Sequence, residues 1–198
     1  MRRLLVSQRI VDDPRHGERR DALDRRWAEF LGECGFLCVA LPNRPGSAVD
    51  FARAIAPAGV LLTGGGDLGA LGGDMPERDA SETAILAWAS QTGVKVFGVC
   101  RGFQVLLHAA GAALERAAGH VGVRHTFEDG RTVNSFHDWV VRAPPTGWIA
   151  THRAADGTIE AAHAADGRLA GQMWHPEREA PFDPRDRARF RVFFGADE

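Results

Sequence analysis

A cysteine between two glycines is the residue of this sequence best suited to nucleophilic chemistry. Residues 98–102 read Gly-Val-Cys-Arg-Gly, after an apolar stretch at 95–99 and before a helix-like stretch at 102–110. A strand-to-helix elbow of this kind strains its central residue, so the flanking residues must be small. The Cys100 thiol would lie at a helix N-terminus, where the dipole favours thiolate, and the Arg101 N–H would face an oxyanion. Taken alone, the pattern also fits a buried cysteine in an ordinary turn.

His175 is the best candidate base for this thiol, within the sequence Trp-His-Pro-Glu at 174–177. Residues 169–174 read as a strand, which places His175 at a carboxyl end, where ligands gather in open parallel sheets. Glu177 lies two residues further on, past a proline that stiffens the backbone. Its carboxylate can accept from one imidazole nitrogen while the other nitrogen faces Cys100. Without this context, a surface turn explains the same residues.

A glycine-rich turn ends a second apolar stretch. Residues 59–63 are apolar, and 63–67 read Thr-Gly-Gly-Gly-Asp. Consecutive glycines let backbone N–H groups approach a ligand closely. The spacing fits neither G-x-x-x-x-G-K-[ST] nor G-x-G-x-x-G, so a phosphate cradle is disfavoured. We expect Gly65 or Gly66 to supply a second oxyanion donor, with a plain flexible turn as the alternative.

Alternating strands and helices would position these three segments. Strands are expected at 3–8, 36–41, 59–63 and 95–99, and helices at 19–34, 48–55, 78–92 and 102–110. This order predicts a mostly parallel central sheet with helices on both faces. Short strands are expected at 131–134, 138–142, 147–151, 157–162 and 169–174. Asp-Gly turns separate several of them, so they should add antiparallel strands at the sheet edge. Asp183 and Pro184 would begin a final helix, reaching about Phe194.

Composition narrows the class of protein. The chain has 198 residues, 44% hydrophobic and 25% charged, with a formal net charge of −2. This predicts one domain over 1–198 and gives no reason to expect nucleic-acid or membrane binding. No apolar run approaches the roughly 18 residues of a spanning helix, and the start reads as a strand, so we expect a cytoplasmic protein. The three cysteines argue against a disulfide framework, and without a CxxC pair or histidines at ligand spacing we expect no metal and no cofactor.

Together these segments resemble the class I glutamine amidotransferase superfamily, over nearly the whole chain. The likeness rests on the glycine-rich turn, on Gly-Val-Cys-Arg-Gly-Phe-Gln at 98–104 and on Trp-His-Pro-Glu at 174–177. With Val-Asn-Ser-Phe-His at 133–137, the chain is more similar to the free-standing γ-glutamyl hydrolase branch of that superfamily. Further segments are similar to the bacterial γ-glutamyl-CDP-amidate hydrolases, which act in the phosphoramidate decoration of surface (capsule) polysaccharide; they lie at 20–27, 63–67, 119–125, 134–139 and 173–179.

The resemblance implies a flavodoxin-like α/β fold and a role for each site residue. Cys100 would attack the γ-carbonyl of a γ-glutamyl amide, His175 would move the proton, and Glu177 would orient His175. Backbone N–H groups of Gly65 and Arg101 would hold the oxyanion, and water would hydrolyse the thioester to release glutamate. The residues that would bind the substrate are Gly66, Gln104, Ser135, Phe136 and His137.

Several polar residues remain open to two interpretations. His120 and His125 would face a phosphate leaving group or lie in a solvated loop. His137 precedes Asp138, so a dyad is conceivable, but a structural or glutamyl-contact role is favoured. Arg78 would recognise the leaving group or simply belong to the first turn of a helix.

Three functions are compatible with the residues. The first is a hydrolase that acts alone on a small γ-glutamyl compound, such as a nucleoside-diphosphate amidate or a γ-glutamyl-aminobutyrate. The second is the glutaminase component of an amidotransferase, which delivers ammonia to a partner synthetase. The third is a binding protein that kept the fold, which the intact Cys100, His175 and Glu177 disfavour. Related folds are often dimers, so a homodimer is compatible with the resemblance.

Overall fold

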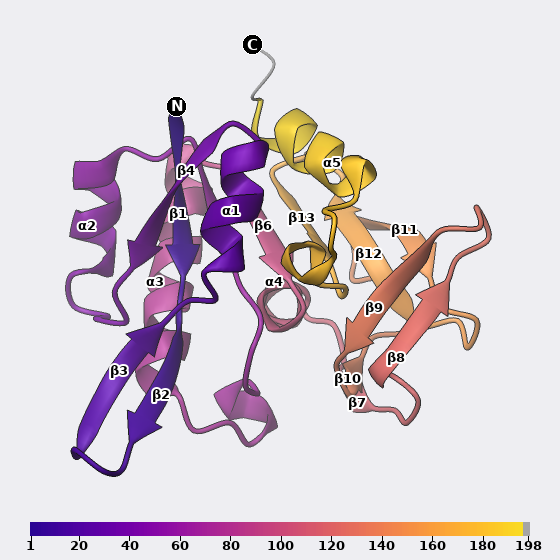
Figure 1. Cartoon of the computed structure of the whole chain (residues 1–198), viewed down its shortest axis with the longest axis horizontal. Helices are drawn as coiled ribbons and strands as arrows, with labels where there is room; N and C mark the ends of the chain where they lie inside the picture. Colours follow the sequence, from indigo (N-terminus) through magenta and orange to yellow (C-terminus); the bar gives the residue numbers. More distant parts are fainter. Residues whose placement is uncertain (196–198) are drawn as a thin grey trace.

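A seven-stranded sheet forms the centre of the computed structural model, which describes residues 1–195 (Figure 1). Across the sheet the strands are β11 (Trp148–Arg153), β12 (Ile159–Ala164), β13 (Leu169–Gln172), β6 (Val96–Val99), β5 (Gly59–Leu62), β1 (Arg2–Ser7) and β4 (Phe36–Leu41). The five strands from β13 to β4 run parallel, and β12 and β11 are antiparallel to their neighbours. The predicted fold class, a mostly parallel sheet with antiparallel strands added by the second half, is confirmed.

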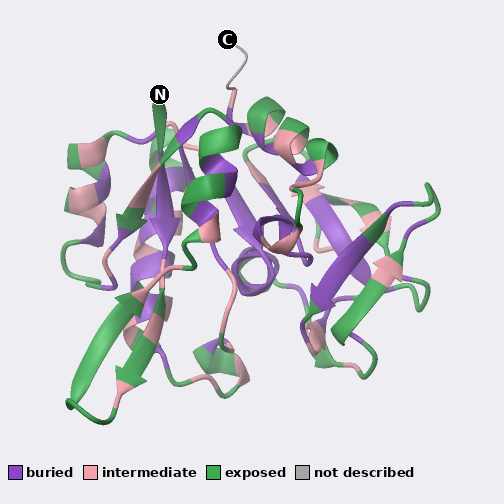
Figure 2. Ribbon diagram, viewed as in Figure 1, coloured by how far each residue is buried: buried purple, intermediate pink, exposed green. Residues whose placement is uncertain are grey.

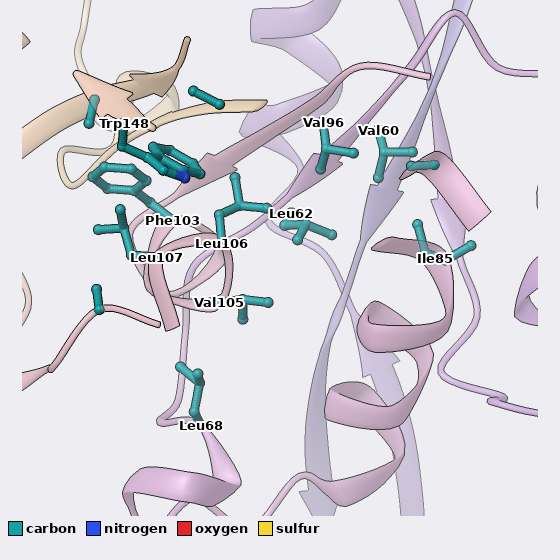
Figure 3. Packing of buried hydrophobic residues seen from close by; sticks show 14 of the residues in the cluster. Val60, Leu62, Leu68, Ile85, Val96, Phe103, Val105, Leu106, Leu107 and Trp148 are labelled. Carbon is teal, nitrogen blue, oxygen red and sulfur yellow. The ribbon is translucent and has the colours of Figure 1, made fainter. Parts of the chain in front are cut away.

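Helices cover both faces of the sheet. On one face lie α2 (Ala48–Ile55), α3 (Pro76–Thr92) and α4 (Arg101–Ala109); on the other lie α1 (Arg26–Glu33) and α5 (Pro184–Phe194). The first face buries Val60 and Val96 with Leu106 of α4 (Figure 3). The second packs Phe97 against Phe190, with ring centroids 4.7 Å apart. Alternate residues of one strand thus face two cores, which explains why these strands are apolar throughout.

The N-terminal half of the helix expected at 19–34 is instead a strand. β2 (Arg9–Asp13) and β3 (Glu18–Ala22) form an antiparallel hairpin, most of it exposed (Figure 2), and α1 begins only at Arg26. The apolar residues at helical spacing start after the hairpin, so residues 18–22 have no face to bury as a helix. Opposite charges pair across the hairpin instead, Arg19 Nε lying 3.7 Å from Asp12 Oδ1.

The second half extends the central sheet less than expected. Only β11 and β12 are added as antiparallel strands, because β13 pairs in parallel with β6. β8 (Val121–Thr126) and β9 (Thr132–Phe136) form a separate hairpin, as do β7 (Glu115–Arg116) with β10 (Trp139–Val140). The β8–β9 hairpin has its own apolar cluster, in which Phe127 and Val133 pack on Ala161 and Trp174. Because the hairpin packs on the central sheet through this cluster, it does not add strands to the edge of that sheet.

The final helix has the predicted beginning. Asp183 Oδ1 accepts from the Arg185 N–H at 2.8 Å, and Pro184 is the first helical residue of α5. Two short 3₁₀ helices, Gly69–Leu71 and Pro176–Arg178, complete the described elements. Within residues 1–195, no helix combines the length and apolarity that crossing a membrane requires.

Candidate active site

Three neighbouring parallel strands bring the predicted segments to one edge of the sheet. The glycine-rich turn follows β5, Cys100 follows β6, and His175 follows β13. A β-carbon built on Gly64 would lie 2.5 Å from His175 Cε1 and 3.3 Å from Cys100 Cβ. The turn therefore touches both side chains, and only glycine fits between them. This is the edge at which open α/β sheets bind ligands.

Cys100 occupies the strained elbow that the sequence predicts. Its φ of 52° and ψ of −111° lie outside the regions that L-residues favour, and the Cys100 N–H donates to Gln172 O of β13 at 2.8 Å. A β-carbon on Gly98 would lie 2.5 Å from the Gly102 carbonyl. One on Gly102 would overlap the carbonyl of Leu62. Strand and helix are packed so closely that both flanking positions require glycine.

His175 lies between Cys100 and Glu177. Its Nδ1 is 2.7 Å from Glu177 Oε1, and its ring interacts with the Cys100 side chain, which lies against the same glycine, Gly64. With Nδ1 held by the carboxylate, Nε2 is the nitrogen directed at sulfur. His175 and Glu177 are each 2% exposed, and Pro176 begins the 3₁₀ turn that brings the carboxylate back towards the ring. This is the geometry that a nucleophile, a base and an orienting group require.

Asn134 of β9 fixes the backbone of His175, a function that the sequence alone does not reveal. The His175 N–H donates to Asn134 Oδ1 at 2.9 Å, and Asn134 Nδ2 donates to His175 O at 2.8 Å. The same Nδ2 donates to Glu179 Oε1 at 2.8 Å. Asn134 is 5% exposed, so these bonds form away from water. The β8–β9 hairpin thus holds His175 beside Cys100.

The environment favours a thiolate–imidazolium pair. Burial alone would raise the pKa of the Cys100 thiol, but the His175 charge, the hydrogen bond from His175 and the Arg101 N–H together lower it. Burial alone would lower the pKa of His175, but the Cys100 charge and hydrogen bond, followed by those of Glu177, raise it to about 9. The two pKa shifts act in the same sense, so within the pair the proton is favoured on His175 and the negative charge on Cys100.

The Arg78 side chain holds the glycine-rich turn by binding its backbone carbonyl groups. Its guanidinium donates to Thr63 O at 2.7 Å and to Gly65 O at 2.8 Å, and its Nε bonds Glu82 Oε1 at 2.9 Å. With these carbonyls held by one buried cation, the Gly65 backbone is fixed at a φ of 95°. Arg78 has no exposed surface, so recognition of a leaving group, one of its two expected roles, is ruled out.

Glu82 links the turn to the elbow. Its Oε2 accepts from Arg101 Nη1 at 2.6 Å, and Arg101 also pairs with Asp79. Burial would raise the pKa of Glu82, but the guanidinium groups of Arg78 and Arg101 hold it below its ordinary value. A charge buried among paired partners is costly to remove, because its partners stay uncompensated. Both proposed oxyanion donors are therefore anchored to one carboxylate of α3.

A cavity of about 150 Å³ opens above Cys100 and His175 and gathers most of the predicted residues. Its lining includes Gly65, Gly66, Asp67, Cys100, Gln104, Phe136, His137, Asp138, Trp139, His175 and Arg178. Gln104 donates to the Trp139 carbonyl at 3.1 Å. Phe136 lies edge-on to His175, with centroids 5.9 Å apart, and the Arg178 guanidinium stacks on the Phe136 ring. A cavity of this size suits one short polar chain beside the thiol.

Two predicted substrate contacts are directed elsewhere. Ser135 is fully buried, does not line the cavity, and donates to the His120 carbonyl at 2.6 Å. His137 borders the cavity, but its Nδ1 lies 3.2 Å from Trp139 O and its Nε2 lies 3.4 Å from Glu160 Oε1. Its ring thus faces a second group of polar residues behind the cavity wall.

The fold and this site together define a class of protein, an α/β protein with a cysteine at a strand–helix elbow beside a His-Pro-Glu turn. The chain belongs to the class-I glutamine amidotransferase family, whose model matches residues 25–193. The described geometry agrees with the match, because the matched range contains the elbow, the glycine-rich turn and the His-Pro-Glu turn.

Three relatives illustrate the range of the family. The chain is 26% identical to a γ-glutamyl-CDP-amidate hydrolase of Campylobacter jejuni, covering 88% of this chain and 89% of the relative. It is 28% identical to a GMP synthase (glutamine-hydrolysing) of Corynebacterium diphtheriae, covering 66% of this chain but 26% of the synthase. A Thermoplasma acidophilum protein assigned as one component of GMP synthase shares the fold with a TM-score of 0.69 and 16% identity, covering 98% of this chain and 94% of that one.

Proposed function

We propose that the chain hydrolyses the γ-glutamyl amide bond of a small γ-glutamyl compound through a thioester on Cys100. One observation carries the proposal: a strained, buried cysteine lies beside His175, whose Nδ1 lies 2.7 Å from Glu177. The similarity to a γ-glutamyl-CDP-amidate hydrolase over 88% of the chain supports the same chemistry. The single domain expected over residues 1–198 contains every group that this reaction uses.

In the first half of the reaction, the Cys100 thiolate forms a bond to the γ-carbonyl carbon. The carbonyl electrons move to oxygen, and the N–H groups of Arg101 and Gly65 stabilise the oxyanion. The intermediate collapses, the C–N bond breaks, and His175 gives its proton to the departing nitrogen. Glu177 stabilises His175 while it is charged and keeps its Nε2 directed at sulfur.

In the second half, water replaces the departed amine or amidate. Neutral His175 removes a proton from water, and the oxygen attacks the thioester carbon. The same oxyanion donors act again, the C–S bond breaks, and glutamate leaves. Sulfur departs as thiolate and His175 keeps the proton, so the pair returns to its starting charges.

The cavity suits a glutamyl chain. Its volume, about 150 Å³, is below the roughly 300–1,000 Å³ of typical ligand pockets, so it selects a short group. Gln104 and Gly66 lie on its lining, and Phe136 forms an apolar wall against His175. Arg178 offers a cation to the α-carboxylate, and Asp67 and Asp138 offer acceptors to the α-ammonium.

For the leaving group, we propose a nucleoside-diphosphate amidate, with γ-glutamyl-CDP-amidate as the substrate of first choice. Beyond the similarity to the Campylobacter jejuni hydrolase, cations lie at the cavity margin. With Arg178 assigned to the α-carboxylate, the cation left for the leaving group is Arg116, which lies 3.6 Å from Asp67 and 2.6 Å from Asp138 of the lining. Guanidinium groups bind diphosphate oxygens in a bidentate manner. On this proposal the reaction belongs to the assembly of phosphoramidate-decorated surface polysaccharide.

The test is glutamate release from a panel of γ-glutamyl compounds that includes glutamine, γ-glutamyl-aminobutyrate and γ-glutamyl-CDP-amidate. We expect the amidate to give the highest kcat/KM with the isolated chain, and Cys100→Ala to bind it without turnover. Turnover of Cys100→Ala at the wild-type rate would contradict the mechanism. A preference for γ-glutamyl-aminobutyrate would reassign the leaving group only.

The relatives among GMP synthases favour a second candidate, the glutaminase component of an amidotransferase. That function predicts weak hydrolysis of glutamine by the chain alone and strong stimulation by a synthetase partner. Amidate hydrolysis by the isolated chain, unchanged by added synthetase, would exclude it.

A further inference from the structure

A second cluster of polar side chains lies behind the cavity wall and has no part in the proposed hydrolysis. It consists of His120, His125, His137 and Glu160, here named the histidine cluster. One ligand atom from each residue lies within 4.8 Å of the other three. His120 precedes β8, His125 belongs to β8, His137 follows β9, and Glu160 belongs to β12. Four separate positions in the sequence thus converge at one point.

Within residues 1–195, the atoms that face one another in the cluster have no hydrogen bond of ordinary geometry. These atoms are His120 Nδ1, His125 Nε2, His137 Nε2 and both carboxylate oxygens of Glu160. Glu160 is fully buried, and His120 and His137 are 2% and 4% exposed. A buried carboxylate whose contacts to imidazoles are this long is only partly compensated, which is costly. The cluster therefore favours a further group at its centre.

The geometry specifies a cation. Glu160 Oε1 lies 3.4 Å from His137 Nε2, 3.7 Å from His120 Nδ1 and 3.8 Å from His125 Nε2. The two longer separations exceed ordinary hydrogen bonds. All three approach the roughly 3.4 Å between ligand atoms that zinc bonds of about 2.0–2.2 Å produce in a tetrahedron. Neither His120 nor His125 lines the cavity beside Cys100, which argues against their contact with a leaving group there.

The imidazole rings of His120 and His137 each have a hydrogen-bond partner on the nitrogen that faces away from the cluster centre. His120 Nε2 lies 3.1 Å from Asp156 Oδ2, and His137 Nδ1 lies 3.2 Å from Trp139 O. A proton on each of these outer nitrogens leaves a lone pair on the nitrogen that faces the centre. Asp156 is itself fixed, because its Oδ1 accepts from the Thr158 hydroxyl at 2.7 Å and from the Thr158 N–H. Metal-binding histidines typically have such support.

We propose that the histidine cluster is a zinc site that fastens the β8–β9 hairpin to β12 beside the active-site cavity. Three imidazoles and one carboxylate complete a tetrahedron, the closed arrangement of structural zinc rather than the open one of catalytic zinc. His137 is at once a zinc ligand and part of the cavity lining. Zinc would therefore hold residues 136–139 in position above Cys100.

The test uses untagged protein, stripped with a chelator and titrated with Zn²⁺ against a chromophoric competitor. We expect one ion per chain, and an increase in Tm of at least about 5 °C on zinc addition. Mg²⁺ should not compete, since it prefers octahedral oxygen ligands. Co²⁺ in place of Zn²⁺ should give the visible bands of a four-coordinate complex without thiolate. Stripped protein that neither binds zinc nor gains stability from it would overturn the proposal.

Variants separate this site from other metal binding. His125→Ala and Glu160→Gln should weaken zinc binding at least about 100-fold, and Asp156→Asn about 10-fold. His163→Ala, on β12 but outside the cluster, is the matched control and should bind as wild type. Cys100→Ala should keep its ion, because the thiolate and His175 are not ligands. Wild-type affinity in Glu160→Gln, or loss of the ion in Cys100→Ala, would contradict the assignment. If the ligand variants do not fold, the proposal is tested by the zinc stoichiometry of the wild-type protein and by the zinc affinity of Asp156→Asn.

Discussion

The parallel and antiparallel regions assemble their reactive groups in different ways. In the parallel region, each candidate catalytic residue follows the end of a strand, and strand order alone brings Cys100 and His175 together. In the antiparallel region, the histidine cluster combines a hairpin with a strand of the central sheet. The arrangement of the parallel region follows from short segments of the sequence. The arrangement of the histidine cluster follows only from how the hairpin packs against the sheet. Asn134 joins the two, because it lies on β9 and bonds the backbone of His175.

The largest effect is expected in the parallel region, from Gly102→Ala. A β-carbon there overlaps the Leu62 carbonyl, so α4 must shift and move Cys100 relative to the proposed oxyanion donor on Gly65. We expect kcat/KM to fall by about 1,000-fold. Gly32→Ala is the control, since its β-carbon would meet nothing within 4 Å among the residues that the structure describes. Steady-state kinetics measure both variants. Equal activity of the two variants would mean that the elbow is not sterically fixed.

A smaller loss is expected from Glu177→Gln, about 100-fold in kcat. Burial lowers the pKa of His175, whereas the thiolate and then Glu177 raise it to about 9, so wild-type activity should decline as pH rises through about 9. Removing the Glu177 charge removes part of the raising effect, so this decline should move to lower pH. Profiles of kcat/KM against pH for both proteins measure the shift. An unchanged alkaline limb would rule out the orienting role.

Asn134→Ala tests the connection between the two regions. Loss of both bonds to the His175 backbone should misplace the imidazole and lower kcat about 10-fold, with little change in KM. Asn134→Asp keeps an oxygen that can accept from the His175 N–H, so it should recover part of kcat. A rise in KM without a change in kcat would show that Asn134 contacts the substrate rather than positioning the base.

The smallest effect is expected from Ser135→Ala, a neighbour of Asn134. Its hydroxyl donates to the His120 carbonyl, so the variant should lose about 1 kcal/mol of unfolding free energy and stay within about twofold of wild-type KM. Urea unfolding and kinetics measure the two quantities. A large rise in KM would restore Ser135 to the substrate contacts that the sequence suggested.

The same contrast explains what the sequence could predict. The elbow at Cys100 and the turn from His175 to Glu177 each lie within a few residues, so spacing and residue type are sufficient. The β2–β3 hairpin could not be predicted, because opposite charges pair across its strands and no alternating apolar pattern marks them. The role of Arg78 in holding the glycine-rich turn could not be predicted, because the carbonyls that it binds lie 13 to 15 residues earlier in the sequence. From its neighbours alone, Arg78 reads only as part of the first turn of a helix. No metal is expected from the sequence because only His120 and His125 lie close together in it, and His137 and Glu160 join them only through packing.

The central claim, a glutamyl thioester on Cys100, is tested most directly by intact-protein mass spectrometry of acid-quenched reactions. With γ-glutamyl-CDP-amidate in excess, we expect one glutamyl group per chain, mapped to the peptide that contains Cys100. It should disappear as substrate is exhausted and be absent from Cys100→Ala. Glutamate release by the wild-type chain at an undiminished rate after selective alkylation of Cys100, or a glutamyl group mapped to another residue, would contradict the account.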